Sequence, residues 1–233
     1  MSIHSIKLIH FMNTREISNS NSNSSLLELV GKRLYIKFMV SMRCKLIVKS
    51  ELEKLALNYK FSPHGAIEFL DGLSQEQQSI LKNNLSKSGL ILLSESESKL
   101  IDRIINTIVE LIHYSDILPR VDYSEVISEH AILGEESILK IFSDVKGMSI
   151  LQFIVVQKVE RVKELMLYND ISLSEIAELL NYKNQFYLIA QFKKITGLTP
   201  SDYKNIKLER MKIVEKYKLD SRKMDSRSNT ATG

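Results

Sequence analysis

The spacing of apolar residues changes several times in the first half of the chain. Clusters of strand-forming residues alternate with segments in which apolar residues recur every three or four positions. In chain order, the pattern predicts a strand, a helix, two strands, a helix and a strand at residues 33–41, 45–57, 58–61, 66–70, 74–87 and 90–93. This βαββαβ order is the split arrangement of ferredoxin-like sandwiches, so we predict an α+β domain. An amphipathic helix is predicted to follow at residues 98–114.

The second half of the chain shows helical spacing from residue 121 onward. A long helix is predicted at 150–168 and a short one at 171–180. A tight turn at 181–182 leads into a longer helix that begins at 183 or 184 and ends at Thr196. A short helix, a tight turn and a longer exposed helix form a helix-turn-helix. The residues predicted to form the core of this half include Leu165, Leu167, Ile176, Leu179, Leu180, Ile195 and Leu198.

Several short motifs in this half match the pattern of a known family, with the same spacing. They are Ile176-Ala177, Phe192-Lys193-Lys194, Gly197-Leu198-Thr199-Pro200 and Tyr203, preceded by Ile141-Phe142, Gly147-Met148-Ser149, Phe153 and Arg161. Over about residues 121–212 the chain therefore resembles the DNA-binding module of AraC-type transcription regulators. The resemblance implies an all-α domain with two helix-turn-helix units, joined by a long helix, each able to enter a major groove. It implies a sequence-specific regulator that binds double-stranded DNA, not an enzyme, and it implies no cofactor.

The resemblance also implies which residues contact DNA. The first recognition helix would span 135–145 and the second 184–195. The residues expected to read bases are Glu136, Ser137 and Lys140 in the first helix and Asn184, Gln185, Ile189 and Ala190 in the second. The residues expected to contact phosphates are Lys183, Lys193, Lys194, Lys204 and Lys207.

Charge distinguishes the two predicted units. Residues 183–218 contain nine basic and three acidic residues, a local charge of +6, and positive charge of this kind attracts the phosphate backbone. The first unit is acidic, with Glu125, Glu129, Glu135, Glu136 and Asp144. We therefore expect the second unit to dominate DNA binding.

The chain departs from the family pattern in and around the second recognition helix. Asn181-Tyr182 stands where the family usually has Gly-Phe, and asparagine tolerates the left-handed backbone that such a turn needs. Phe186 occupies a position that is usually small. Ile189 and Ala190 stand where polar or basic residues are common, and their side chains can contact thymine methyls but cannot hydrogen-bond to base edges.

Composition narrows the functional classes only in part. The 233 residues are 44% hydrophobic, enough for one or two globular domains, and the net charge of +4 is too small to name a partner. The single cysteine excludes an internal disulfide and a cysteine-based zinc site. No apolar run approaches the ~18 residues of a membrane-spanning helix, so we expect a soluble cytoplasmic protein.

The same patterns predict how the chain is divided. Residues 1–30 contain the serine–asparagine tract 18–25 and are predicted to be a flexible extension. The ferredoxin-like domain with its trailing helix would occupy 31–118 and the AraC-type domain 119–218. The polar residues 219–233 are predicted to be a disordered tail.

Two alternative functions remain open at the level of sequence. The N-terminal half has a weaker resemblance to small heavy-metal-associated domains, with Met42-Arg43-Cys44 at the first strand-to-helix junction. That half is the natural candidate for dimerisation or for binding a small-molecule or metal effector, and a metal-carrying protein is one alternative. The other is a degenerate family member that binds protein through Phe186, Ile189 and Ala190.

Overall fold

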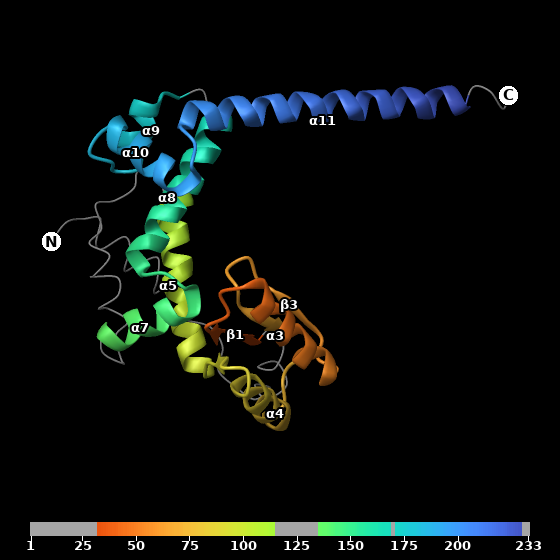
Figure 1. The fold of residues 1–233 in the computed structure, drawn as a ribbon, viewed down its shortest axis with the longest axis vertical. Helices are drawn as coiled ribbons and strands as arrows, with labels where there is room; N and C mark the ends of the chain where they lie inside the picture. The colour runs from red at the N-terminus through yellow and green to blue at the C-terminus, as the bar shows by residue number, and fades with distance from the viewer. Residues whose placement is uncertain (1–31, 115–134, 169–170, 230–233) are drawn as a thin grey trace, which may run out of the picture.

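The computed structural model describes residues 32–114, 135–168 and 171–229, with side chains described up to residue 218 except at 135 (Figure 1). The predicted extension at 1–30 lies outside the described residues, as do Glu125, Glu129, the predicted domain boundary at 118–119 and residues 230–233. Among the helices that are described, none is long and apolar enough to cross a membrane.

The N-terminal half combines short strands with helices, and the C-terminal half is helical. The first half contains β1 (Lys32–Leu34), β2 (Ile36–Lys37), α3 (Met42–Lys54), β3 (Tyr59–Phe61), β4 (Ile67–Phe69), α4 (Gln75–Ser86), β5 (Ile91–Leu92) and α5 (Glu95–His113). The second contains α7 (Glu135–Lys146), α8 (Ile150–Tyr168), α9 (Leu173–Leu179), α10 (Gln185–Thr196) and α11 (Pro200–Asn229). The coarse prediction of an α+β half followed by a helical half is confirmed.

The predicted first strand, 33–41, is divided into β1 and β2 on either side of Tyr35. β1 pairs antiparallel with β4, which pairs antiparallel with β3, whereas β2 pairs antiparallel with β5. The amide of Tyr35 donates to Ser98 Oγ of α5 at 3.1 Å instead of to a neighbouring strand. Two small sheets therefore stand where the sequence predicts one, because a side chain from α5 satisfies the backbone at the break.

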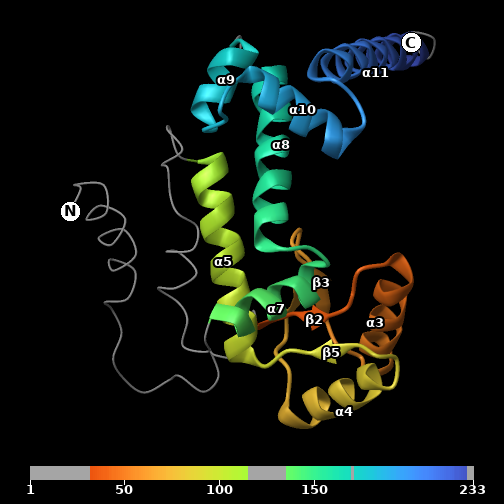
Figure 2. The same cartoon turned by 60° about the vertical axis from the view of Figure 1, so that its left-hand side comes forward.

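Side chains alternate between two hydrophobic cores across this break. Leu34 and Ile36 are buried in the core that contains residues of α3 and α4, whereas Tyr35 is buried in the core formed with α5, α7 and α8. The period of two typical of a strand continues through Tyr35. The strands thus lie between α3 and α4 and the helices that lead to the C-terminal half (Figure 2).

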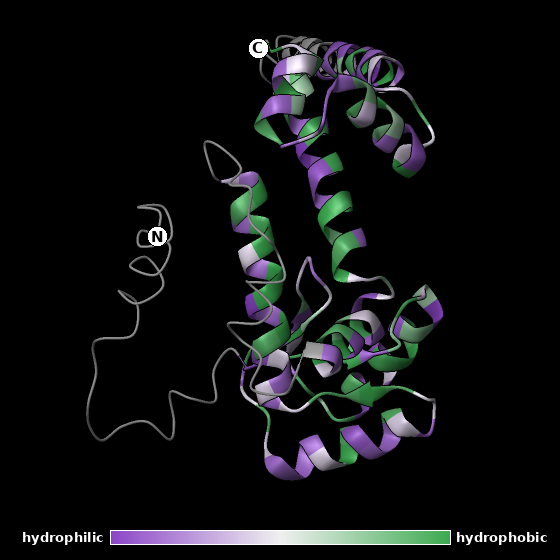
Figure 3. Ribbon diagram, turned by 90° about the vertical axis from the view of Figure 1, so that its left-hand side faces the viewer, coloured by the Kyte–Doolittle hydropathy of each residue, from purple (hydrophilic) through white to green (hydrophobic). Residues whose placement is uncertain are grey.

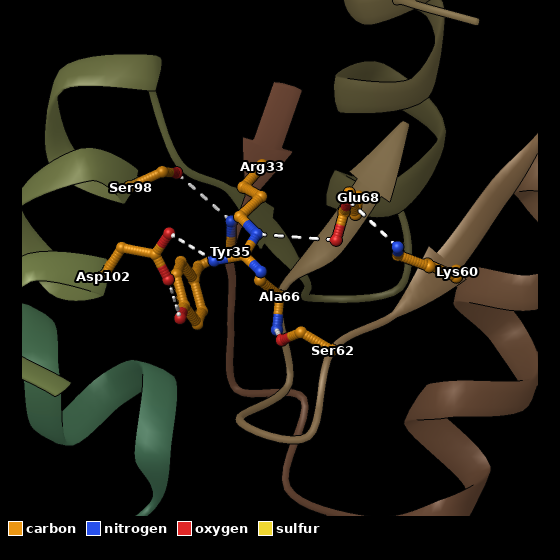
Figure 4. A network of polar contacts seen from close by, with 8 residues as sticks. All are labelled: Arg33, Tyr35, Lys60, Ser62, Ala66, Glu68, Ser98 and Asp102. Atoms are coloured by element: carbon orange, nitrogen blue, oxygen red, sulfur yellow. Dashed lines mark hydrogen bonds and ion pairs between the residues drawn. The ribbon is translucent and has the colours of Figure 1, made fainter. Parts of the chain in front are cut away.

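A polar network holds α5 against β1 (Figure 4). Asp102 of α5 accepts a hydrogen bond from the Tyr35 hydroxyl at 2.6 Å and pairs with Arg33 at 3.2 Å. Arg33 also approaches Glu68 of β4 at 3.5 Å. Burial, followed by the hydrogen bond to Asp102, raises the pKa of Tyr35, so the phenol stays protonated and remains a donor.

Several helix ends differ from the sequence prediction for local reasons. α3 begins at Met42 rather than 45 because the Ser41 side chain accepts from the Cys44 amide, and it ends at Lys54, before Ala56 with φ of 50°. α5 begins at Glu95 rather than 98 because Ser94 and Glu97 form a capping box. α11 continues to Asn229, through residues predicted to be a disordered tail, in a stretch without glycine or proline after Pro200.

The C-terminal end of α7 docks on the N-terminal half. The amide of Phe38 donates to the carbonyl of Asp144 at 2.7 Å, and Lys37 lies 3.8 Å from the Asp144 carboxylate. Lys146 Nζ donates to the carbonyl of His64, in the turn between β3 and β4, at 2.9 Å. The two halves are therefore joined by direct backbone and side-chain contacts and by one hydrophobic core.

Two glycines that end helices allow this contact to be tested. Gly147 after α7 and Gly197 after α10 have φ of 67° and 78°, but a Cβ on Gly147 would lie 2.8 Å from Val40 Cγ1, whereas one on Gly197 would meet nothing within 4 Å. We expect Gly197→Ala to lower the free energy of unfolding by about 1–2 kcal/mol, the cost of the left-handed conformation. Gly147→Ala should cost more in urea unfolding, because it adds the clash. In a Val40→Ala background the two costs should become equal, and a persistent difference would contradict the assigned contact.

The His64 side chain makes the stability of this junction depend on pH. Its ring packs edge-on against Phe153 of α8, with centroids 6.4 Å apart, and burial, followed by the charge of Lys146, lowers its pKa. A lowered pKa in the folded state gives stability that is present above the unfolded value of about 6.5 and lost as the pH falls through the folded value. We expect urea unfolding to show a decrease in stability as the pH falls below about 6.5, and His64→Asn to make this decrease smaller. An identical pH dependence in both proteins would disprove the role of His64.

Candidate nucleic-acid interface

The helix α8 connects two hydrophobic cores. Ile150, Phe153 and Ile154 near its start are buried with α5 and α7, whereas Val159 and Val162 further along are buried with α9 and α10. Hydrophobic residues recur along both α5 and α8, which run side by side (Figure 3). The predicted long helix at 150–168 is confirmed at both ends.

The end of α5 also holds α8 through polar contacts. His113 Nδ1 lies 3.2 Å from Glu164 Oε2, and His113 Nε2 lies 3.2 Å from Gln157 Oε1. Arg161 pairs with the same Glu164 oxygen at 3.1 Å. The connecting helix is thus fixed by the N-terminal half over most of its length.

A helix-turn-helix follows α8, and its ends are defined by local hydrogen bonds. Ser172 and Glu175 form a capping box at the start of α9. Asn181 makes the turn with φ of 53°, as its side chain permits. Gly197 ends α10 in the left-handed conformation, with φ of 78°. The predicted short helix, turn and longer helix are confirmed.

The core of this unit contains much of the sequence signature. Ile176, Ala177 and Phe192 are at most 2% exposed, and Phe192 packs edge-on against Tyr203 with centroids 5.6 Å apart. Ammonium groups of two lysines, in α8 and α11, lie 5.6 and 5.7 Å from the Tyr203 ring. Leu165, Ile176 and Leu180 of the predicted core are buried, but Ile195 is 41% and Leu198 36% exposed, because both follow the last buried turn of α10.

The side of α10 turned away from this core is apolar at its start and basic at its end. Leu188 and Phe192 are buried on the inner side. Phe186 is 70% and Tyr187 55% exposed. We call the exposed residues opposite the core the outward face of α10: Phe186, Tyr187, Ala190, Lys193 and Lys194.

Three of the predicted base-reading residues of α10 lie off this face. The side-chain oxygen of Asn184 accepts from the amides of Phe186 and Tyr187 at 3.0 and 3.1 Å, so this residue is the N-cap. Gln185 is half-buried, and Ile189 packs against the core. Ala190 is the predicted base-reading residue of α10 that lies on the outward face.

The predicted phosphate-contacting lysines lie around α10 and along α11. Lys183, Lys193 and Lys194 are exposed, whereas Lys204 and Lys207 are half-buried on the first turns of α11. The Lys183 ammonium lies 5.4 Å from the Tyr187 ring centroid, a cation–π distance. Lys193 and Lys194 therefore belong to the outward face, Lys183 lies beside it, and the other two lie on the helix that follows.

A groove between α8 and α10 brings in a lysine that sequence reasoning missed. Its volume is about 420 Å³, and Lys158, Lys183 and Lys194 are among its lining residues. Burial lowers the pKa of Lys158, whose ammonium lies 5.3 Å from the Tyr182 ring. The Tyr182 hydroxyl and Gln191 Oε1 are buried there and have no hydrogen-bond partner among the described residues. The sequence signal for Lys158 is weak, because a lysine within a helix is most often a solvated residue.

The first predicted recognition helix, α7, exposes its predicted base-reading residues. Glu136, Ser137 and Lys140 are exposed, whereas Ile138 and Phe142 are buried against α5 and α8. Among the described residues of α7, the exposed side carries one lysine, Lys140, instead of a cluster like that around α10. α7 is thus accessible on its outer side while its C-terminal end is held by the N-terminal half.

Comparison with known families assigns the helical region. Residues 127–206 match the model of a helix-turn-helix domain. The C-terminal region is a helix-turn-helix domain of the AraC type. Comparison with curated proteins gives no match.

Several solved structures are similar to the AraC-type domain. The C-terminal domain of AraT, a response regulator from Geobacillus stearothermophilus, is 22% identical, and the match covers 47% of this chain and 86% of that one with a TM-score of 0.40. The DNA-binding domain of AdpA in complex with a target DNA is 20% identical, covering 47% and 94%, with a TM-score of 0.40. A transcriptional regulator from Chromobacterium violaceum with an AraC-type DNA-binding domain is 8% identical, covering 48% and 95%, with a TM-score of 0.42.

In the N-terminal half, the surroundings of Met42 and Cys44 do not resemble a metal site. Cys44 Sγ accepts a hydrogen bond from Ser41 Oγ at 3.1 Å, and Met42 is 70% exposed. Within the described ranges, no group of three or more histidine, cysteine, aspartate or glutamate residues is placed to hold a metal ion. The metal-carrying alternative therefore receives no support from the geometry.

The N-cap role of Asn184 can be measured separately from any contact with DNA. We expect Asn184→Ala to lower the free energy of unfolding by about 0.5–2 kcal/mol, because two amides at the start of α10 lose their acceptor. Asn184→Ser should recover most of this loss, since serine is also a good N-cap. Urea unfolding of the three proteins makes the comparison. Unchanged stability in Asn184→Ala would show that the cap is not formed in solution.

Proposed function

We propose that this chain is a sequence-specific transcription regulator that reads the major groove of double-stranded DNA with α10. The observation that carries the proposal is the outward face of α10, whose side chains are exposed and are flanked by lysines on both sides. A recognition helix contacts base edges with its N-terminal residues, and Phe186 and Tyr187 in the first turn of α10 are exposed. The match of residues 127–206 to a helix-turn-helix domain supports the same function.

Lysines around α10 supply the affinity for the phosphate backbone. Lys183 precedes the helix, Lys193 and Lys194 lie in its last turn, and Lys204 follows in α11. Lys158 adds a further positive charge, from the groove between α8 and α10. Neutralisation of phosphates by such groups releases counterions and makes binding fall steeply with salt.

The residues that the family resemblance implies as base-reading would have unequal roles, because they differ in position relative to the outward face. Ala190, on the outward face, would contact a base, whereas Gln185 and Ile189 lie off the face, and Asn184 supports the helix start. In the first unit, Glu136, Ser137 and Lys140 are exposed on α7. The first unit then contributes a weaker contact, because its acidic groups oppose phosphate.

The N-terminal half acts on the DNA-binding half as a sensing or dimerising domain with a ferredoxin-like arrangement. If β1 and β2 are one strand bent at Tyr35, the strand neighbours are β5, β1–β2, β4 and β3, all antiparallel. That is the neighbour order of a split βαββαβ sheet, with α3 and α4 in contact with each other. A small-molecule or metal effector would act through this half and its contacts with α7 and α8.

A second candidate function is protein binding by the same face. Phe186 and Tyr187 are large, exposed and adjacent, a feature that also marks protein contact sites. Lysines on both sides favour DNA over an apolar protein surface, so we place DNA first.

Replacement of two lysines tests the DNA-binding proposal. We expect the full chain to bind duplex DNA with an affinity that falls with salt, measured by fluorescence anisotropy at several salt concentrations. Lys193→Gln with Lys194→Gln should reduce the slope of log K against log salt by about 0.9 for each lysine that contacts a phosphate. Binding that does not change in this variant would contradict the assignment.

A matched control is available on the opposite half of the chain. Lys82 lies in α4 and Lys87 directly follows that helix. Both lysines are exposed, and α4 is far from α10 in the fold (Figure 1). Lys82→Gln with Lys87→Gln removes the same net charge and should leave the salt slope unchanged. An equal loss in both variants would show that net charge alone, and not the surface around α10, determines binding.

A further inference from the structure

The part of α10 that would meet base edges carries apolar side chains. Phe186 and Tyr187 are the second and third residues of the helix, and Ala190 lies one turn further on the same face. Resting on the proposed DNA-binding function, we propose that the second unit recognises thymine methyl groups, and that Phe186 is the main specificity-determining residue. The operator half-site read by α10 would therefore be rich in A·T pairs with their thymine methyls facing Phe186 and Ala190.

The polar groups of the helix start are engaged elsewhere, which leaves few alternatives for base recognition. The Asn184 side-chain oxygen is held by two amides of the same helix. Gln191 Oε1 is buried beside the groove, and Gln185 is half-buried. Apart from the two lysines, the polar atom on the outward face is the Tyr187 hydroxyl. The pairing of an amide side chain with adenine, a common way to read A·T pairs, has no exposed residue on this face to make it.

Thymine offers the apolar group that such a face can recognise. Its C5-methyl projects into the major groove, and it is the base feature there that apolar side chains contact. Phe186 is 70% exposed, and its burial against a methyl would remove apolar surface from water on both sides. Ala190 is small enough to let the helix approach the bases closely.

The charges around this apolar centre favour DNA as the occupant. Lys183 stands over the Tyr187 ring, and Lys193 and Lys194 continue the same face. An apolar centre with a cationic rim complements a groove that has methyl groups on its floor and phosphates on both edges. A protein partner with an apolar patch would gain nothing from these three positive charges.

Substitution of deoxyuridine for thymidine tests the inference directly, because it removes only the methyl group. The full chain is first used to select an enriched motif from random duplex DNA. The selected duplex is then made with each thymidine in turn replaced by deoxyuridine, and dissociation constants are measured by fluorescence anisotropy at one salt concentration. We expect at least one replacement to weaken binding about fourfold, the effect of losing one buried methyl group.

The Phe186→Ala variant links this loss to one side chain. In Phe186→Ala the thymidine and uridine duplexes should bind equally at the sensitive position, whereas Lys193→Ala should weaken both duplexes alike and keep the fourfold ratio. Phe186 is largely exposed, so thermal unfolding should show that its replacement leaves stability unchanged.

The outcomes separate this inference from the proposed function. Binding that no uridine replacement weakens overturns thymine recognition, and a ratio that survives in Phe186→Ala overturns the assignment to Phe186; both results leave the DNA-binding proposal standing. Binding without an enriched motif overturns thymine recognition together with the sequence-specific part of the proposed function. Failure to bind any duplex overturns both.

Discussion

The burial of α8 in two hydrophobic cores is the constraint on which the rest of the structure depends. One end of the helix is packed with α5 and α7, and the other with α9 and α10. Apolar side chains at both ends of this rigid helix are removed from water, so the helix fixes the separation and orientation of the elements packed on it. His113 also contacts Gln157 and Glu164 of this helix. These polar contacts fix the rotation of α8 about its axis, which apolar packing alone would define less well.

The N-terminal half is part of this arrangement rather than a separate module on a linker. Tyr35 lies in the same core as residues of α5, α7 and α8, and its hydroxyl is held by Asp102. Lys146 and the backbone of Asp144 bind the strand and turn residues on the other side. The N-terminal half therefore shares one hydrophobic core and direct polar contacts with α7 and α8.

The surface around α10 combines two requirements that compete for the same helix. Its inner residues build the core of the second unit, with Leu188 and Phe192 buried, and its first amides need a cap, which Asn184 provides. What remains for recognition is an apolar and basic face. The proposed reading of thymine methyls follows from this division, since hydrogen-bonding side chains that serve the fold are not free to serve the groove.

Local sequence determined the helix-turn-helix almost completely. Capping residues, the left-handed Asn181 and the glycine after α10 act within a few residues, so their effects can be read without knowing the fold. Tertiary structure decided which side of α10 faces the core. As a result Ile189 packs against the core and Phe186 stays on the outward face. Tertiary structure also brought Lys158 into the groove that Lys183 and Lys194 line. It also divided the first strand, because the partner of the Tyr35 amide lies 63 residues away in α5. Periodicity specifies the faces of an element but not its partners, and function here depends on the partners.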